Sequence, residues 1–124
     1  MRALVVSLAV AACLIAAAPA GAAWTGSGTC KVPAGQRESF PNVTSKTRLR
    51  TKNVPCYEAA FSVEDAARKG LLEPSRPARF EFRSFGARWV HDWTCRRTKR
   101  EEHFSFSCRD EDGGTMSFRR PRSR

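Results

Sequence analysis

The most regular part of the chain is residues 79–118, which read RFEFRSFGARWVHDWTCRRTKREEHFSFSCRDEDGGTMSF. Apolar and polar side chains alternate there in four segments, 79–83, 89–95, 104–108 and 115–118, and a period of two is typical of strands with one buried face. The connections between them are short, which favours antiparallel neighbours. We therefore predict a four-stranded antiparallel meander with one aromatic face. The inward phase comprises Phe80, Phe82, Trp89, His91, Trp93, Cys95, Phe104, Phe106, Cys108, Met116 and Phe118.

One helix is predicted upstream of the meander, over residues 55–69. Pro55 suits the first helical turn and Gly70 suits the C-terminal end. Apolar residues recur at helical spacing, namely Cys56, Ala60, Val63, Ala67 and Leu71. An alternative is a break at Phe61, because residues 62–65, Ser-Val-Glu-Asp, could form a new capping box.

Residues 45–52 also alternate, with Lys or Arg on one side and Thr or Leu on the other, and they give a candidate fifth strand with one charged face. The predicted fold class is α+β: one helix packed on a four-stranded antiparallel meander, or a five-stranded one if 45–52 joins it. About 100 residues can bury one core, so we assign residues 24–118 to a single domain. Residues 119–124, RRPRSR, are expected to form a disordered basic tail.

The first 23 residues have the organisation of a cleaved signal peptide. Arg2 gives a positive start, residues 3–18 are almost wholly apolar, and Ala20-Gly21-Ala22-Ala23 supplies small residues before a cleavage site. We therefore expect a secreted or periplasmic, envelope-associated protein without a transmembrane segment in the mature chain. An alternative is lipidation of Cys13, since Val10-Ala11-Ala12-Cys13 resembles a lipobox.

Removal of residues 1–23 leaves 124 − 23 = 101 residues with four cysteines, Cys30, Cys56, Cys95 and Cys108. An even number of cysteines in a short exported chain indicates disulfides. Cys95 and Cys108 share the inward phase of consecutive strands, which favours their pairing and leaves Cys30 with Cys56. The alternative connectivities, in which Cys56 bridges to a strand cysteine and Cys30 takes the other, remain open at this point.

Four short motifs carry a resemblance to other proteins: VPCYEAA at 54–60, WTC at 93–95, SC at 107–108, and Gly114 followed by Phe118. Together they resemble a loose class of small, uncharacterised secreted proteins of high-GC bacteria, which carry a cysteine-bearing helix followed by a cysteine-containing β-meander. The resemblance covers about residues 50–120. It implies an exported α+β fold and no particular activity.

Candidate catalytic and metal-binding residues are few. His91 and His103 fall on opposite faces of the predicted sheet, so they cannot act together as acid and base. The chain has no Cys-x-x-Cys pair typical of zinc sites, and residues 110–114, DEDGG, do not continue as a calcium loop and are expected to form a hairpin turn. No Gly-x-Ser-x-Gly motif is present. We therefore expect a non-enzymatic protein without a catalytic site, a metal site or a cofactor.

The remaining signal is positive charge. The chain carries 22 Lys and Arg against 12 Asp and Glu, and cleavage after Ala23 would lower the net charge of +10 only by the one charge of Arg2. Such a field attracts polyanions, although a basic surface can also serve solubility alone. The candidate anion-binding residues lie in the polar phase of the strands: Arg79, Arg83, Arg88, Arg96, Arg109, Arg119, Lys46, Arg48, Arg50 and Lys52.

The expected function is binding of an anionic partner, such as an envelope polymer, lipid head groups or an acidic protein, through this Arg/Lys face. We expect no sequence-specific nucleic-acid binding, because the aromatic residues follow the core phase and are not available for base stacking. One alternative is a secreted inhibitor or effector that recognises a protein target through loops such as 32–44 or 72–78. A further alternative is a small secreted hydrolase.

Overall fold

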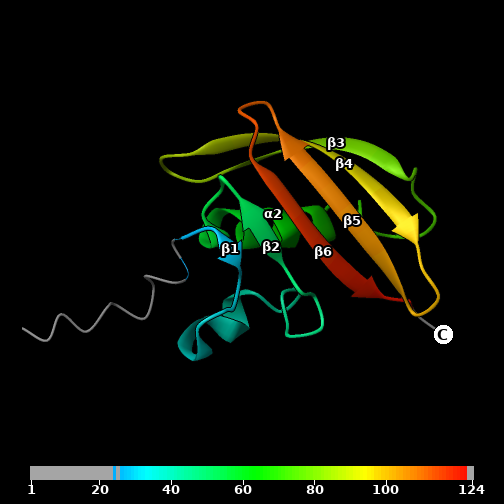
Figure 1. The fold of residues 1–124 in the computed structure, drawn as a ribbon, viewed down its shortest axis with the longest axis horizontal. Helices are drawn as coiled ribbons and strands as arrows, with labels where there is room; N and C mark the ends of the chain where they lie inside the picture. The colour runs from blue at the N-terminus through cyan, green and yellow to red at the C-terminus, as the bar shows by residue number, and fades with distance from the viewer. Residues whose placement is uncertain (1–23, 25, 123–124) are drawn as a thin grey trace, which may run out of the picture.

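The computed structural model describes Trp24 and residues 26–122. They form one six-stranded antiparallel sheet with a single long helix, α2, lying across one of its faces (Figure 1). In this part of the chain no helix has the length and apolar character needed to cross a membrane. The predictions of a signal peptide and of a lipid anchor at Cys13 concern residues 1–23, which lie outside the described residues.

The predicted meander is present as four consecutive antiparallel strands. Each pairs with the next in the chain, so the helix-facing side chains of one strand lie directly opposite those of its neighbour. Tight connections between successive strands enforce this order. The strands are β3 (Arg79–Phe85), β4 (Val90–Lys99), β5 (His103–Asp110) and β6 (Thr115–Pro121).

The prediction of four or five strands was too low, because two short strands extend the sheet beyond β6. β2 (Arg50–Lys52) pairs with β6, and β1 (Gly28–Thr29) pairs with β2, which gives the order β1-β2-β6-β5-β4-β3. β2 is the paired part of the predicted strand 45–52, whereas β1, with two residues, is too short to produce a recognisable period in the sequence. Their pairing is instead set by the free edge of β6, whose unpaired backbone groups need partners.

The predicted strand 45–52 and the predicted tail 119–124 both have different boundaries in the structure. Of the predicted strand 45–52 only the last three residues pair, because Arg48 has a left-handed backbone conformation with φ 48° that interrupts the extended chain. Thr47, Leu49 and Thr51 are nevertheless buried. At the other end β6 continues to Pro121, so Arg119 and Arg120 belong to the sheet instead of a disordered tail.

Helix α2 (Cys56–Arg68) agrees closely with the prediction. Pro55 precedes its first turn in an extended conformation, as expected of a residue that lacks an amide hydrogen. The helix is continuous through residues 61–65, and the Ser62 hydroxyl donates a hydrogen bond to the Glu58 backbone carbonyl (2.8 Å). A 3₁₀ helix, η1 (Ala34–Ser39), lies within the region expected to be loop.

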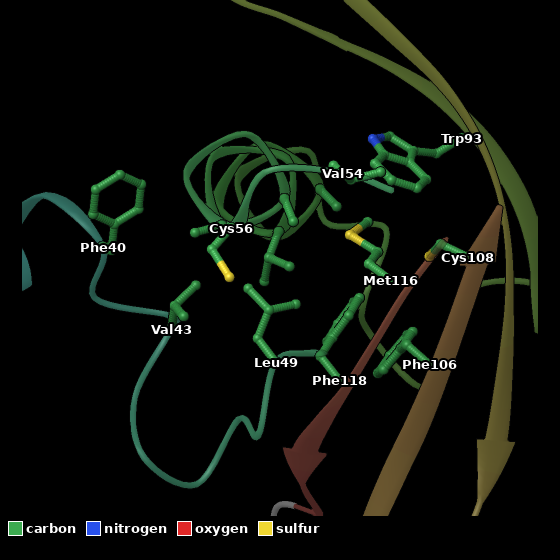
Figure 2. Close-up of a cluster of buried hydrophobic side chains, with 14 of the residues drawn as sticks. Phe40, Val43, Leu49, Val54, Cys56, Trp93, Phe106, Cys108, Met116 and Phe118 are labelled. Carbon is green, nitrogen blue, oxygen red and sulfur yellow. The ribbon is translucent and has the colours of Figure 1, made fainter. Parts of the chain in front are cut away.

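The core lies between α2 and the sheet, with the 40–54 segment closing one end (Figure 2). Phe106 and Phe118 stack on neighbouring strands with ring centroids 4.7 Å apart, and Trp93 is almost fully buried. Two disulfides, Cys30–Cys56 and Cys95–Cys108, are present, which is the connectivity that strand phase favours. The first joins the N-terminal segment to the start of α2, and the second joins residues directly opposite on β4 and β5.

Candidate anion-binding surface

The face of the sheet opposite α2 carries a group of positively charged side chains. Residues that alternate with the buried ones point to this side, and the strand register places them in rows across the sheet. Helix α2 covers only the other face (Figure 1). We call this outward group the basic face: Arg50, Lys52, Arg79, Arg83, Arg96, Arg109 and Arg119.

One row of the basic face crosses five strands without a carboxylate. Direct register partners link Arg79 to Arg96, Arg96 to Ser107, Ser107 to Ser117, and Ser117 to Arg50. At about 4.8 Å between strands, the row spans about 19 Å. Like charges directly opposite each other destabilise a sheet, so the Arg79–Arg96 pair carries an energetic cost that a bound anion would relieve.

Arg83 differs from the other arginines of the basic face because a carboxylate already engages it. Its Nε and Nη2 donate to Asp92 Oδ1 and Oδ2 at 2.7 and 3.3 Å. The hydrogen bond from Arg83 holds the pKa of Asp92 below its ordinary value, and the same pairing raises the pKa of Arg83. The charge of Arg83 is therefore locally balanced, unlike that of Arg79 or Arg96.

A second concentration of charge lies at one end of the sheet, where a groove of about 920 Å³ opens between the 31–48 segment and β6. Arg119 on β6 donates its backbone N–H to Thr47 O (2.7 Å), and Cys30 donates its own to Leu49 O (2.8 Å), which fixes the two walls. No acidic residue lines the groove. We call it the basic groove, after its cationic lining residues Lys31, Arg37, Arg48, Arg50 and Arg119.

The structure therefore divides the predicted anion-binding residues. Seven of the ten form the basic face, and Arg48 joins Arg50 and Arg119 in the basic groove. Lys46 lies in the turn before β2 and Arg88 in the turn between β3 and β4, outside both the basic face and the basic groove.

The sequence analysis did not identify Lys31 and Arg37 as candidates, since each is an isolated basic residue in a region predicted to be loop. No periodic signal marks them, and only the folding of 31–48 against β6 brings them to the groove.

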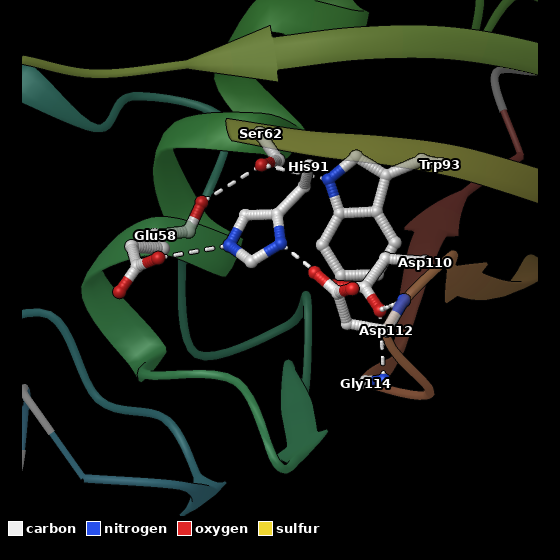
Figure 3. Close-up of polar contacts among 7 residues, drawn as sticks. All are labelled: Glu58, Ser62, His91, Trp93, Asp110, Asp112 and Gly114. Atoms are coloured by element: carbon white, nitrogen blue, oxygen red, sulfur yellow. Dashed lines mark hydrogen bonds and ion pairs between the residues drawn. The ribbon is translucent and has the colours of Figure 1, made fainter. Parts of the chain in front are cut away.

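The most connected polar cluster of the described residues surrounds His91, on the other side of the sheet (Figure 3). Its Nε2 lies 2.8 Å from Glu58 Oε1 on α2, and its Nδ1 lies 2.7 Å from Asp110 Oδ2 on β5. Asp110 also accepts the backbone N–H groups of Asp112 and Gly114, which closes the β5–β6 turn. Nearby, Trp93 Nε1 donates to the Ser62 hydroxyl.

This cluster joins a helix, two strands and a turn. Each ring nitrogen of His91 lies within hydrogen-bond distance of a carboxylate, so the side chain links β4 to α2 and β5. His103 lies on the outward face, opposite Pro121, so the two histidines are separated by the sheet as expected. Among the described residues no cluster of three or more His, Cys, Asp or Glu could hold a metal ion.

Comparisons with known proteins give no relative from which a role could be transferred. No protein family, no curated protein and no solved structure matches the chain. The basic face and the basic groove are therefore the features of the molecule that indicate a function.

Proposed function

We propose that this protein is a non-enzymatic, exported module that binds an anionic polymer or surface through the basic face. Extracytoplasmic partners of this chemistry include envelope polymers, acidic lipid head groups and acidic proteins. The two disulfides are consistent with a location outside the cytoplasm.

The observation that supports this proposal best is the uncompensated row through Arg79 and Arg96. In the described part of the chain neither arginine forms an ion pair, and each faces the other directly across neighbouring strands. Serine hydroxyls lie between the arginine guanidinium groups of this row, so several donors are available to phosphate, sulfate or carboxylate oxygens. A purely solubilising surface would gain stability by placing a carboxylate opposite one of these arginines.

The burial of the core aromatic side chains favours binding of the charged groups of a polymer over stacking on nucleic-acid bases. Phe106, Phe118 and Trp93 are buried under α2. The outward rows contain mainly Arg, Lys, Ser and Thr, and also Glu81, Asp92 and, at the end of β3, the exposed Phe85. Affinity would then come mainly from charge neutralisation and counterion release, which weakens steeply as salt increases.

Replacement of Arg96 by glutamate tests the proposal. The introduced carboxylate would lie directly opposite Arg79, so the free energy of unfolding should rise by about 0.2–1 kcal/mol while binding falls. We expect the salt concentration that elutes the variant from immobilised heparin to be markedly lower than for the wild-type protein.

The matched control is Arg88→Glu, which changes the net charge equally in a turn outside the basic face. It should shift elution much less. Equal shifts for the two variants would mean that only net charge matters, and the basic face would then not be a binding surface.

A further inference from the structure

We infer that the basic groove is a distinct site for a compact, polar ligand that carries several phosphate ester groups, such as a phosphorylated saccharide. The inference rests on the proposed function, since the groove shares Arg50 and Arg119 with the basic face. It adds a ligand class and a place, because the groove is hollow whereas the rest of the basic face follows the sheet.

The charge of the groove sets the charge of its ligand. Five cationic side chains line one hollow, no carboxylate lines it, and none of the five forms an ion pair within the described residues. A phosphate monoester carries about −1.5 to −2 charges at neutral pH, so about three such groups would balance the five cations. Arginine binds phosphate with two parallel N–H donors, and four of the five residues are arginines.

The size and lining of the groove indicate a compact, polar carrier of these groups. Its volume of about 920 Å³ lies within the range of small-molecule sites. Except for Pro41, the apolar lining residues are buried in the core, so the cations and hydroxyls supply most of the contacts that a ligand could make. The apolar lining residues are Val32, Phe40, Pro41, Val43, Phe106 and Phe118. The lining hydroxyls, which can donate to phosphate oxygens, are those of Thr29, Thr44, Ser45, Ser105 and Ser117.

Arg48 gives an independent reason to assign function to this groove. Its φ of 48° lies in the left-handed region, where a non-glycine residue costs of the order of 1–2 kcal/mol. Glycine would adopt the same conformation without that cost. The stability of the turn therefore does not favour an arginine at this position, and the exposed Arg48 side chain lines the groove.

Two matched double variants separate the groove from the face. Arg37→Gln with Arg48→Gly removes two charges that belong only to the basic groove, and Arg79→Gln with Arg96→Gln removes two that belong only to the basic face. Arg48→Gly suits the left-handed backbone, and Arg37 is exposed on η1, so both variants should fold. Measurement of their thermal unfolding midpoints checks that both variants are folded.

The wild-type protein and both variants, as disulfide-intact mature chains, are titrated calorimetrically at about 150 mM salt, roughly the physiological value, with inositol hexakisphosphate as the probe.

We expect one molecule of the probe per chain, at least tenfold weaker binding by the groove variant, and less than a twofold change for the face variant. Inositol hexasulfate, with lower charge on each group, should bind more weakly than the phosphate. Equal losses in the two variants, several probe molecules per chain, or no binding at this salt would overturn the groove assignment.

Retention of the same two double variants on immobilised heparin distinguishes a failure of this inference from a failure of the proposed function. Weaker heparin retention by the face variant, combined with equal inositol phosphate affinities, would keep the proposed function and overturn the groove site. Unchanged heparin retention in both variants, combined with the selective loss of inositol phosphate binding, would overturn the proposed function and support a site for small ligands alone.

Discussion

His91 is the side chain whose environment depends most on residues distant in sequence. Its two carboxylate partners lie 33 residues earlier, at Glu58, and 19 residues later, at Asp110. The side chain of Asp110 is only 4% exposed, so its charge must be satisfied internally. His91 and the turn amides of Asp112 and Gly114 do this together.

Replacement of His91 by phenylalanine should therefore be strongly destabilising. It leaves Glu58 and Asp110 without their shared partner, and a buried polar group that loses its hydrogen-bond partner costs about 1–3 kcal/mol. Chemical denaturation should show a loss of this size. His103→Phe is the control, since His103 is outward and its side chain makes no hydrogen bond in the described structure, and it should stay within about 0.5 kcal/mol. Similar stabilities for the two variants would mean that the His91 contacts contribute little.

The Arg83–Asp92 pair gives a prediction for pH dependence. The pKa of Asp92 is lowered in the folded protein by the hydrogen bond from Arg83, whereas aspartate in an unfolded chain has a pKa of about 3.9. The stabilisation is therefore fully present above that value and is lost as the pH falls through the lower folded pKa. An NMR titration of the Asp92 carboxyl carbon should give a midpoint below the ordinary range, and Arg83→Gln should move it upward. An unchanged midpoint in the variant would contradict the pairing.

The two disulfides act on elements of different intrinsic stability. Cys95–Cys108 joins β4 and β5, which are already paired over seven consecutive positions. Cys30–Cys56 joins the residue after a two-residue strand to the first residue of α2, across a sequence separation of 26. This disulfide adds to the β1–β2 pairing, the Cys30–Leu49 backbone hydrogen bond and the burial of Trp24 in holding the N-terminal segment beside the basic groove.

Removal of each disulfide by a pair of Cys→Ala changes should show this difference. The loop-entropy relation gives losses of about 3.5 kcal/mol for Cys30–Cys56 and about 3 kcal/mol for Cys95–Cys108. Hydrogen exchange should distinguish them further: without Cys30–Cys56 the amides of 26–50 should exchange faster while β3 to β6 stay protected. Uniformly faster exchange throughout the sheet would show that the N-terminal segment is not a separate unit.

At the scale of the whole molecule, the distribution of the acidic residues explains the basic face. Several carboxylates are paired on the helix side or at the ends of the sheet, and so do not balance the outward arginines. Asp65 pairs with Arg68 and Lys69, and Glu73 lies near Arg120. The face that α2 leaves uncovered therefore carries seven basic side chains against two carboxylates, Glu81 and Asp92.

The sequence by itself determined the parts of the fold that local periodicity specifies. Helix α2 was predicted to within one residue at each end, and the meander was predicted with the correct inward phase for Trp93, Phe106 and Cys108. That phase was enough to favour Cys95–Cys108, because side chains of equal phase on paired strands lie opposite each other. It also identified the arginines that point outward.

Only the tertiary structure decided the features that arise from contacts between distant segments. The strands β1 and β2 form because β6 offers an unpaired edge, the partners of His91 come from α2 and β5, and the basic groove exists because 31–48 folds against β6. Lys31 and Arg37 carry no periodic signal, since neither lies in a regular strand or α-helix. Local propensity fixes which face a residue occupies within its own element. The position of one element against another follows from burial and backbone pairing summed over the whole chain, and that sum is not visible in any short stretch of sequence.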